Sequence, residues 1–351
     1  MTTRASVERS AFGAIPDGRA VCLFEIRNGR GLVLRMIDYG ATVLSLETPD
    51  RAGRRANVTL GFPSLAGYLD QTTYFGCTVG RTCNRIARAR FVLEGESFTL
   101  DANDGPHHLH GGSPGFGRRL WQGEPFCDET GAGVEFSHVS PDGDGGYPGR
   151  VEATARYALN DRDEFSVEFS ATCDRATPVD LTNHCYWNLR GAGAGIIREH
   201  RLEIAADGFL PVDAGLIPTG EIAPVAGTAM DFREPRAIGA RLDEVAVGAG
   251  VGYDHCLVVR GRPGTLRFAA RVHEPQSGRV MEVHTSQPAL QFYSGNSLDG
   301  SSRAGGHGRW SGFCLEAQHY PDSVNRPDFP SPILRPGEIY RQRTVHRFSV
   351  R

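Results

Sequence analysis

The sequence predicts an all-β protein, a large sandwich of antiparallel sheets with few short helices. Apolar and polar residues alternate along many short runs, and almost no stretch shows the helical period. The 44 glycines and 21 prolines are spread over all 351 residues, so they separate many short elements rather than forming one linker. Such punctuation is typical of sandwiches. No compositional break or fixed repeat marks a boundary, so we expect residues 1–351 to form a single domain.

The alternation is clearest in two neighbouring runs in the middle of the chain. In VEATARYAL (151–159) every second residue, from Val151 to Leu159, falls on one face. In FSVEFSAT (165–172) Val167 and Phe169 do the same, and the NDRDE segment between the runs predicts a hairpin loop. The same pattern predicts strands in three further stretches: 90–100, 265–285 with a turn at 275–278, and 339–350.

Two stretches are candidates for helix. EPRAIGARLDE (234–244) places Ile238 and Leu242 four residues apart, and PSLAGYLD (63–70) predicts a short helical turn.

Composition excludes several functional classes. A formal net charge of -3 offers no basic field, so we expect no nucleic acid partner. No segment approaches the roughly 18 apolar residues of a membrane helix, and the opening MTTRASVERSAFG lacks a signal-peptide core, so we expect no membrane association and a cytoplasmic protein. The eight cysteines form no C-x-x-C pair and predict reduced core thiols. We expect a monomer or a homodimer.

Three segments combine ionisable side chains with strand-like or turn-like settings. The first is GRTCNRIARARF (80–91), followed by the histidine-rich loop GPHHLHGG (105–112). The second is DLTNHCYWNL (180–189), where alternation places His184 with Tyr186 on one face. The third is SGFCLEAQHYPD (311–322), where Glu316 has Phe, Leu and Cys as neighbours and is expected to be partly buried.

The motifs do not predict a metal or a nucleotide cofactor. His107, His108 and His110 could bind zinc, but the first two are adjacent in sequence and no cysteine or acidic residue stands at a familiar spacing. The glycine-rich loops lack both G-x-G-x-x-G and G-K-[ST], and no G-x-S-x-G predicts a serine nucleophile. We therefore expect a site without cofactor or metal.

Taken together, the motifs resemble those of the aldose 1-epimerase (galactose mutarotase) family. They follow the family's order from about residue 38 to residue 340 and cover most of the chain. The matching stretches are DYGATV, FGCTVGRTCNRIARARF, NDGPHHLHGG, SPDGDGGYPG, DLTNHCYWNL, DGFLPVD, IPTGE, MDFR, GYDHCL, QFYSGNSLDG, SGFCLEAQHYPDSVNRPDFPS and LRPGEIY.

The resemblance implies a mutarotase-type supersandwich that interconverts the α and β anomers of free monosaccharides such as glucose or galactose, with no cofactor. It implies Glu316 as general base and His184 as general acid, with His110 as a second active-site histidine. If the first two groups sit a few ångströms apart, each should stabilise the charged form of the other. Four residues are implied to hold sugar hydroxyls: Asn84, Arg85, Asp254 and Gln291.

Three other interpretations are considered. A glycoside hydrolase or lyase on a similar sandwich would use two carboxylates flanking one bond. A sugar-binding domain without turnover would have lost the acid or the base, and both are present. A hexose-6-phosphate epimerase would need arginines for the phosphate, for which the sequence offers Arg81, Arg85, Arg118 and Arg119.

Overall fold

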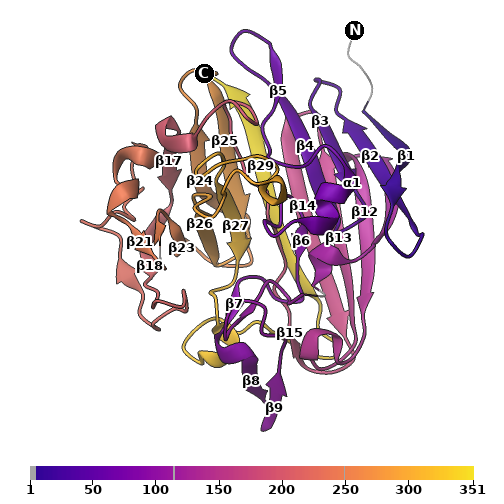
Figure 1. Cartoon of the computed structure of the whole chain (residues 1–351), viewed down its shortest axis with the longest axis vertical. Coiled ribbons are helices and arrows are strands. Elements are labelled where there is room, and N and C mark those ends of the chain that lie inside the picture. Colours follow the sequence, from indigo (N-terminus) through magenta and orange to yellow (C-terminus); the bar gives the residue numbers. More distant parts are fainter. Residues whose placement is uncertain (1–4, 114, 249) are drawn as a thin grey trace.

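The computed structural model describes residues 5–113, 115–248 and 250–351, and its strands form three main sheets (Figure 1). Met1–Arg4, part of the opening stretch considered above, lie outside these residues. The first sheet has five strands in chain order, joined by antiparallel pairings. They are β1 (Ser6–Ala14), β2 (Ala20–Arg27), β3 (Val33–Ile37), β4 (Thr42–Pro49) and β5 (Arg55–Asn57).

The second sheet has nine strands and forms the back of the sandwich. Its middle is the last long strand of the chain, which pairs with a strand from each half of the sheet. In spatial order the strands are β11 (Gln122–Asp128), β12 (Gly131–Ser140), β13 (Val151–Leu159), β14 (Glu164–Cys173), β29 (Tyr340–Val350), β25 (Arg279–Thr285), β24 (Arg267–His273), β17 (Arg201–Ile204) and β20 (Arg236–Ala237).

The third sheet has five strands and carries part of the candidate site. In spatial order they are β19 (Ala223–Pro224), β18 (Ala206–Leu210), β23 (Asp254–Val259), β26 (Ala289–Tyr293) and β27 (Cys314–Gln318). Short two-stranded ladders complete the fold: β6 (Thr78–Val79) with β16 (Thr182–Asn183), β7 (Arg85–Ile86) with β10 (His108–Leu109), β8 (Arg90–Leu93) with β9 (Glu96–Thr99), β15 (Thr177–Pro178) with β28 (Ile333–Leu334), and β21 (Ala246–Val247) with β22 (Gly250–Val251).

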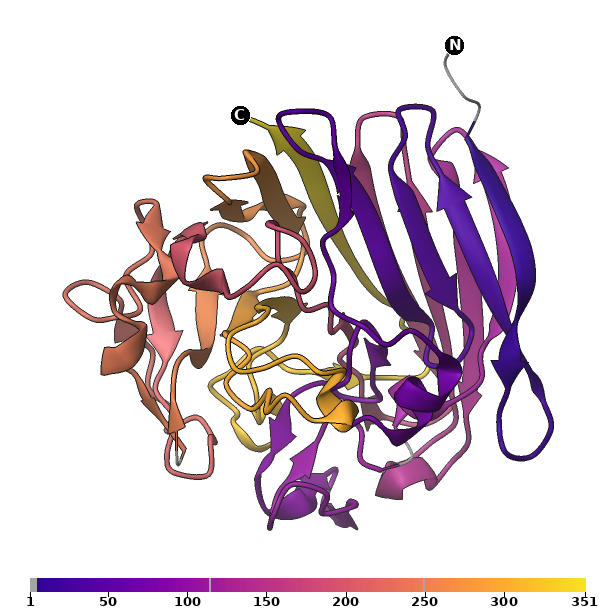
Figure 2. The same cartoon turned by 45° about the horizontal axis from the view of Figure 1, so that its top comes forward.

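The sheets pack as layers around a shared apolar core. In Figures 1 and 2 the first sheet, in indigo to purple, faces the magenta strands β12–β14 of the large sheet. The largest cluster of buried apolar side chains draws on all three sheets, with Phe24 from β2, Tyr157 from β13 and Leu290 from β26. Because each of these sheets buries one face, the alternation seen in the sequence is the direct result of this packing.

Most predicted strands are confirmed. The runs 151–159 and 165–172 are β13 and β14, joined at the predicted hairpin, and the run 339–350 is β29 from Tyr340. The runs 90–100 and 265–285 form the hairpins β8–β9 and β24–β25. Short helices are also as predicted: the described residues contain one α-helix, α1 (Leu65–Asp70), within the expected turn at 63–70. No described helix has the length and apolarity needed to cross a bilayer.

The predicted helix at 234–244 is wrong. The segment begins with β20 and continues as two separate 3-10 turns, η5 (Ile238–Ala240) and η6 (Leu242–Glu244). Arg241 between them has φ -135° and ψ 16°, which no continuous helix allows. Ile238 and Leu242 are both buried, so the spacing that suggested a helix reflects two turns packed on one core. The other 3-10 turns are η1 (Ala87–Ala89), η2 (Phe116–Arg118), η3 (Asp144–Gly146), η4 (Ile197–Glu199), η7 (Ser302–Ala304) and η8 (Ser323–Asn325).

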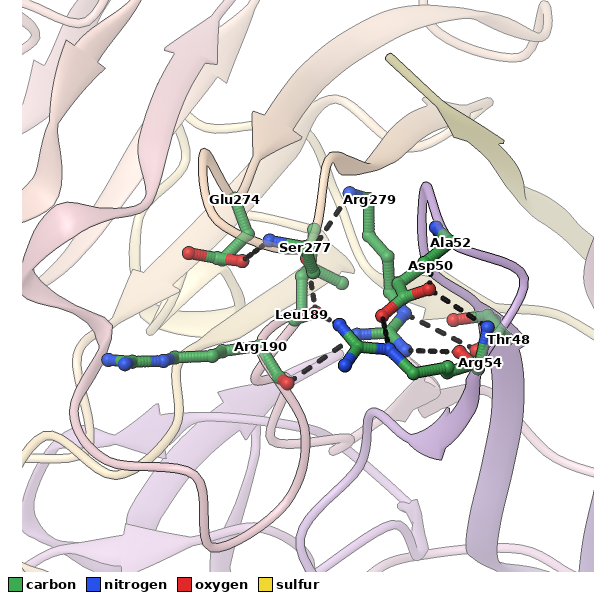
Figure 3. Close-up of polar contacts among 9 residues, drawn as sticks. All are labelled: Thr48, Asp50, Ala52, Arg54, Leu189, Arg190, Glu274, Ser277 and Arg279. Atoms are coloured by element: carbon green, nitrogen blue, oxygen red, sulfur yellow. Dashed lines mark hydrogen bonds and ion pairs between the residues drawn. The ribbon is translucent and has the colours of Figure 1, made fainter.

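A buried arginine ties the end of the first sheet to the large sheet. Arg279 begins β25, is 3% exposed, and donates hydrogen bonds to the carbonyls of Thr48 at 3.3 Å and Arg54 at 3.1 Å (Figure 3). It also donates to the carbonyls of Leu189 at 3.0 Å and Arg190 at 3.4 Å. One guanidinium therefore donates to four carbonyls from three segments. Two of these carbonyls accept a second bond, that of Arg54 from the Asp50 N–H and that of Leu189 from the Ser277 hydroxyl.

We expect Arg279→Met to lower the free energy of unfolding by about 2–4 kcal/mol, because four carbonyls lose the Arg279 donor, although those of Arg54 and Leu189 keep a second one. Urea unfolding followed by tryptophan fluorescence measures the change. Arg262→Met, at an exposed position, is the matched control. A loss below about 0.5 kcal/mol at Arg279, the size expected of ordinary surface substitutions, would contradict this structural role.

Candidate active site

Three adjacent strands of the third sheet present three polar side chains on one face. In the β26–β27 pairing Gln291 stands directly opposite Glu316, and in the β23–β26 pairing Cys256 stands opposite Gln291. Asp254 lies two residues before Cys256, so strand alternation turns it to the same face as the other two. The Gln291 amide donates a 2.6 Å hydrogen bond to Asp254 Oδ1. Strand register therefore fixes the carboxyl of Glu316 beside this pair.

Asn84 and His110 flank the short ladder β7–β10, and two hydrogen bonds join them. The backbone N–H of His110 donates to the Asn84 carbonyl at 3.1 Å, and the backbone N–H of Asn84 donates to His110 Nδ1 at 3.1 Å. Both residues have left-handed backbones, with φ 57° and 54°, a conformation in which Asn and His are enriched among residues other than glycine. Arg85 follows and pairs through Nε with Asp104 Oδ2 at 2.7 Å.

His184 follows β16, and its backbone is fixed by β6 and the segment before it. Its N–H donates to the Cys77 carbonyl at 3.0 Å, and its own carbonyl accepts from Gly76 at 3.0 Å. The imidazole stacks with the Tyr186 ring, with centroids 5.1 Å apart and planes at 20°. It also stacks with Tyr74 at 5.9 Å and 22°. The ring is therefore held against two tyrosines while its edges remain free for polar contacts.

These elements enclose one pocket of about 140 Å³ that gathers all seven residues implied by the resemblance. Glu316, His184 and His110 line it together with Asn84, Arg85, Asp254 and Gln291. The remaining lining residues are Thr72, Thr73, Tyr74, Leu109, Tyr186, Tyr293 and Ser297. Most of this lining is polar, which suits a ligand rich in hydroxyl groups. Two larger hollows, of 390 and 470 Å³, share none of these residues.

Several polar atoms in this pocket have no partner within the described chain. Glu316 is 3% exposed, and its Oε2 receives no hydrogen bond from any described residue. The same holds for Gln291 Oε1. Buried acceptors of this kind are costly unless a ligand or water supplies a donor. Both atoms belong to the wall that strand register builds, so the site offers acceptors to incoming hydroxyl groups.

Glu316 and His184 lie close together, and burial favours the neutral form of both. His184 Nε2 is 3.7 Å from Glu316 Oε1. Burial raises the pKa of Glu316 well above its usual value, the Asp254 charge adds to this, and Arg85 opposes it. Burial lowers the pKa of His184 to about 4, opposed by a backbone carbonyl. The expected mutual stabilisation of charged forms is therefore outweighed by desolvation in the pocket as it stands.

His110, His184 and Glu316 offer donor atoms within 4.8 Å of one another, yet they do not suit a metal ion. The Asn84 backbone amide can only donate, so His110 Nδ1 must accept, and a neutral ring then carries its proton on Nε2. A metal at Nε2 would need the opposite tautomer and would set two hydrogens against each other at Nδ1. Burial likewise lowers the pKa of His110 well below its usual value, which keeps the ring neutral.

The other histidines of the GPHHLHGG loop have separate structural roles. His108, one of the three histidines considered for zinc, is fully buried in β10. Its Nδ1 donates to the Asp101 carbonyl at 2.7 Å, so its Nε2 accepts from the Tyr147 hydroxyl at 2.7 Å. His107 accepts the backbone N–H of Arg88 at 3.1 Å and does not line the pocket.

Part of the pocket wall comes from residues that no sequence motif indicated. Thr72, Thr73 and Tyr74 line it from the loop after α1. Of the two aromatic residues in DLTNHCYWNL, Tyr186 lines the pocket, whereas Trp187 is packed in the largest core cluster. Cys314, from the segment that carries Glu316, places its Sγ 3.6 Å from His184 Nδ1.

The chain as a whole is similar to known proteins. The family model described as aldose 1-epimerase matches residues 23–347. The chain belongs to the aldose 1-epimerase family. Galactose mutarotase from Bos taurus is 47% identical over 349 residues, which cover 98% of this chain and 99% of the relative. Aldose 1-epimerase from Escherichia coli K12 is 39% identical over 341 residues, covering 95% and 96%. Members of this family are isomerases that act on carbohydrates, and the chain is an enzyme of that class.

Solved structures agree with the observed fold. Galactose 1-epimerase from Lactobacillus acidophilus NCFM matches with a TM-score of 0.86 and 27% identity, covering 99% of both chains. An aldose epimerase homologue from C. elegans matches with a TM-score of 0.85 and 32% identity, covering 93% of this chain and 98% of that one. The predicted antiparallel supersandwich is therefore confirmed.

The raised pKa of Glu316 predicts a pH-dependent loss of stability. Its usual pKa is 4.5, so above that value the folded state holds this proton more tightly than the unfolded state. The free energy of unfolding should therefore fall as pH rises toward the folded pKa. Glu316→Gln removes this pH dependence, and we expect the variant to become increasingly more stable than wild type from about pH 5 up to the folded pKa of Glu316, by at most ~1.4 kcal/mol per pH unit.

Urea unfolding at several pH values measures this difference. The shift at His184 is present in both proteins and largely cancels in the comparison. Glu129→Gln, at an exposed position, should track wild type at every pH. A constant offset between Glu316→Gln and wild type across the range would show that Glu316 ionises normally in the folded protein.

Proposed function

We propose that the protein is an aldose 1-epimerase that interconverts the α and β anomers of free monosaccharides such as glucose or galactose. The observation that carries the proposal is the buried pair of Glu316 and His184, 3.7 Å apart, in a pocket otherwise lined by groups suited to hydroxyls. The 47% identity to a galactose mutarotase along almost the whole chain supports it.

The reaction needs one proton to leave the anomeric hydroxyl and one to reach the ring oxygen. Glu316 as a carboxylate takes the proton from O1, while His184 as an imidazolium gives a proton to the ring oxygen, which opens the hemiacetal to an aldehyde. Rotation about the C1–C2 bond then presents the other face of the carbonyl. Ring closure returns both protons, so the pair ends in its starting state and no covalent intermediate is required.

Burial brings the two protonation states of the pair closer to each other in free energy. Opening leaves a carboxylic acid and a neutral imidazole, the forms that desolvation favours at Glu316 and His184. The starting ion pair is favoured by polar sugar hydroxyls and by the Arg85 charge, which opposes the raised pKa of Glu316. Neither protonation state is therefore much higher in free energy than the other, and the pair can exchange protons with the sugar.

Hydrogen bonding at Nδ1 distinguishes the two histidines. An imidazolium at His110 would turn an N–H toward the backbone N–H of Asn84, whereas His184 has no backbone N–H against its ring among its described contacts. We therefore assign the acid to His184 and give His110 the part of a neutral donor through Nε2. His110 then binds an oxygen of the sugar without transferring a proton.

The remaining polar residues would hold the sugar while C1 turns. Asp254 and Gln291 line the pocket from strands β23 and β26 of the third sheet. Asn84 and Arg85 line it from the start of β7. A phosphorylated hexose fits less well, because Arg85 alone of the four arginines considered lines the pocket and is already paired with Asp104. Arg81 donates to carbonyls at Pro148 and Gly149, away from the pocket lining. A neutral sugar is the better substrate.

Three further expectations remain part of the proposal. A single domain is supported by the largest core cluster, which runs from Phe24 to Phe348. A cytoplasmic location is supported by the eight cysteines, all described as free thiols. The monomer or homodimer expectation rests on the sequence alone.

Glu316→Gln and His184→Gln should each lower kcat for mutarotation by roughly 10² to 10⁴, because each removes a group that moves a proton. His110→Gln keeps an N–H donor near the Nε2 position and should lower kcat by less than about tenfold. Polarimetry on fresh α-glucose and α-galactose measures all three. Full wild-type rates for Glu316→Gln on every sugar would refute its role as base.

Controls come from the same chain. Glu129→Gln and His107→Gln change like residues outside the pocket and should keep wild-type rates. Equal losses at His110 and His184 would argue that both histidines move protons. Because Asp254 gives the pocket a second carboxyl group, oligosaccharides are incubated in parallel. New reducing ends would favour the hydrolase interpretation instead.

A further inference from the structure

We propose that Cys314 is a positioning residue that fixes the tautomer of His184 by accepting a hydrogen bond from its Nδ1. The inference rests on the proposed acid role of His184 and adds a residue to it. Its observation is the contact of 3.6 Å between Cys314 Sγ and His184 Nδ1, two buried residues, at the ring nitrogen that does not face Glu316.

The strand that carries the base also carries this thiol. Cys314 and Glu316 lie two residues apart on β27, so alternation turns both toward the same side of the third sheet. His184 is thereby met by the same strand at both nitrogens, with Nε2 toward Glu316 and Nδ1 toward Cys314. Any shift of β27 would move the base and the thiol together, which keeps the geometry of the three groups coupled.

Protonation states decide the direction of the contact. Burial raises the pKa of Cys314 well above its usual value, and the nearby Glu316 charge adds to this, so the sulfur keeps its proton. The proton that His184 exchanges with the sugar sits on Nε2, the nitrogen that faces Glu316 and the pocket, so the neutral ring left after the transfer carries its proton on Nδ1. Cys314 Sγ accepts that N–H, and it remains the acceptor when Nε2 is protonated again and the ring becomes an imidazolium.

The other groups around the ring do not do this. Tyr74 and Tyr186 stack on the imidazole, and His110 meets it edge to face with centroids 5.1 Å apart. The backbone carbonyl that opposes the lowered pKa of His184 is also an acceptor and stabilises a protonated ring. Cys314 is the side chain in this shell that contacts Nδ1 and can accept its proton in both states of the ring.

The test reads the tautomer directly. Long-range 1H–15N correlation spectra of 15N-histidine-labelled protein distinguish protonated from unprotonated ring nitrogens, and His184→Gln assigns the resonances. In wild type at neutral pH we expect His184 to carry its proton on Nδ1. In Cys314→Ala we expect a mixture of both tautomers, with kcat about tenfold lower and KM within about twofold.

Two further variants complete the design. Cys314→Ser keeps a donor and acceptor at shorter reach and should recover part of both signals, which loss of packing alone would not explain. Cys185→Ala removes a buried thiol from the residue next to His184, whose side chain belongs to the main core, and should leave the tautomer unchanged.

The outcomes separate this inference from the proposed function. A wild-type His184 with its proton on Nε2, or unaltered 15N shifts in Cys314→Ala, would overturn the role of Cys314, and the first result requires no variant to fold. If wild-type protein turned over no sugar, the proposed function would fail, while the spectra would still report whether the thiol sets the tautomer.

Discussion

Removal of water from Glu316 and His184 is the constraint on which the rest of the site depends. In water a carboxyl group ionises well below neutral pH and an imidazole ionises near it, so the two groups would hold their protons independently. Burial raises the first pKa and lowers the second, so that the two protonation states of the pair approach each other in energy. Such a pair exchanges protons with a bound hydroxyl easily, but only if the fold supports the cost of burying it.

Two kinds of backbone in the sandwich hold the buried groups in position. Regular strands β23, β26 and β27 place acidic and amide groups by register, which tolerates little displacement. The histidines come from irregular segments, which are held instead by single strong contacts such as the reciprocal bonds of Asn84 and His110. Buried arginines hold irregular segments in the same way. Arg81 donates a hydrogen bond to the Pro148 carbonyl, and Arg279 donates to the Thr48 carbonyl at the end of the first sheet.

Sequence patterns predicted the regular part of this structure well. Alternation located β13, β14 and β29, because a strand with one buried face has a period of two whatever its partner. The same logic failed at 234–244, where Ile238 and Leu242 reach the core from separate turns, and spacing alone does not distinguish that from a helix. The ladder β7–β10 is two residues per strand, too short for any periodic pattern to mark it.

The site itself was predicted by resemblance rather than by pattern. All seven residues that the family motifs implied lie around one pocket, although they are spread from Asn84 to Glu316 along the chain. Nothing in the local sequence indicates which distant segments meet, since that depends on the order of strands in three sheets. Tyr74 lies outside every motif, and Cys314 lies within one but received no role, because the importance of both residues comes only from what they contact.

The two histidines of the pocket differ most in the atom that faces Nδ1. A backbone amide, as at His110, is a donor in every state of the protein, so it permits one tautomer and resists a second proton. A thiol, as at His184, can accept the Nδ1 proton that stays on the ring while Nε2 releases and recovers its own. An acceptor at Nδ1 therefore stands behind the ring that must release a proton, and a donor stands behind the ring that must not.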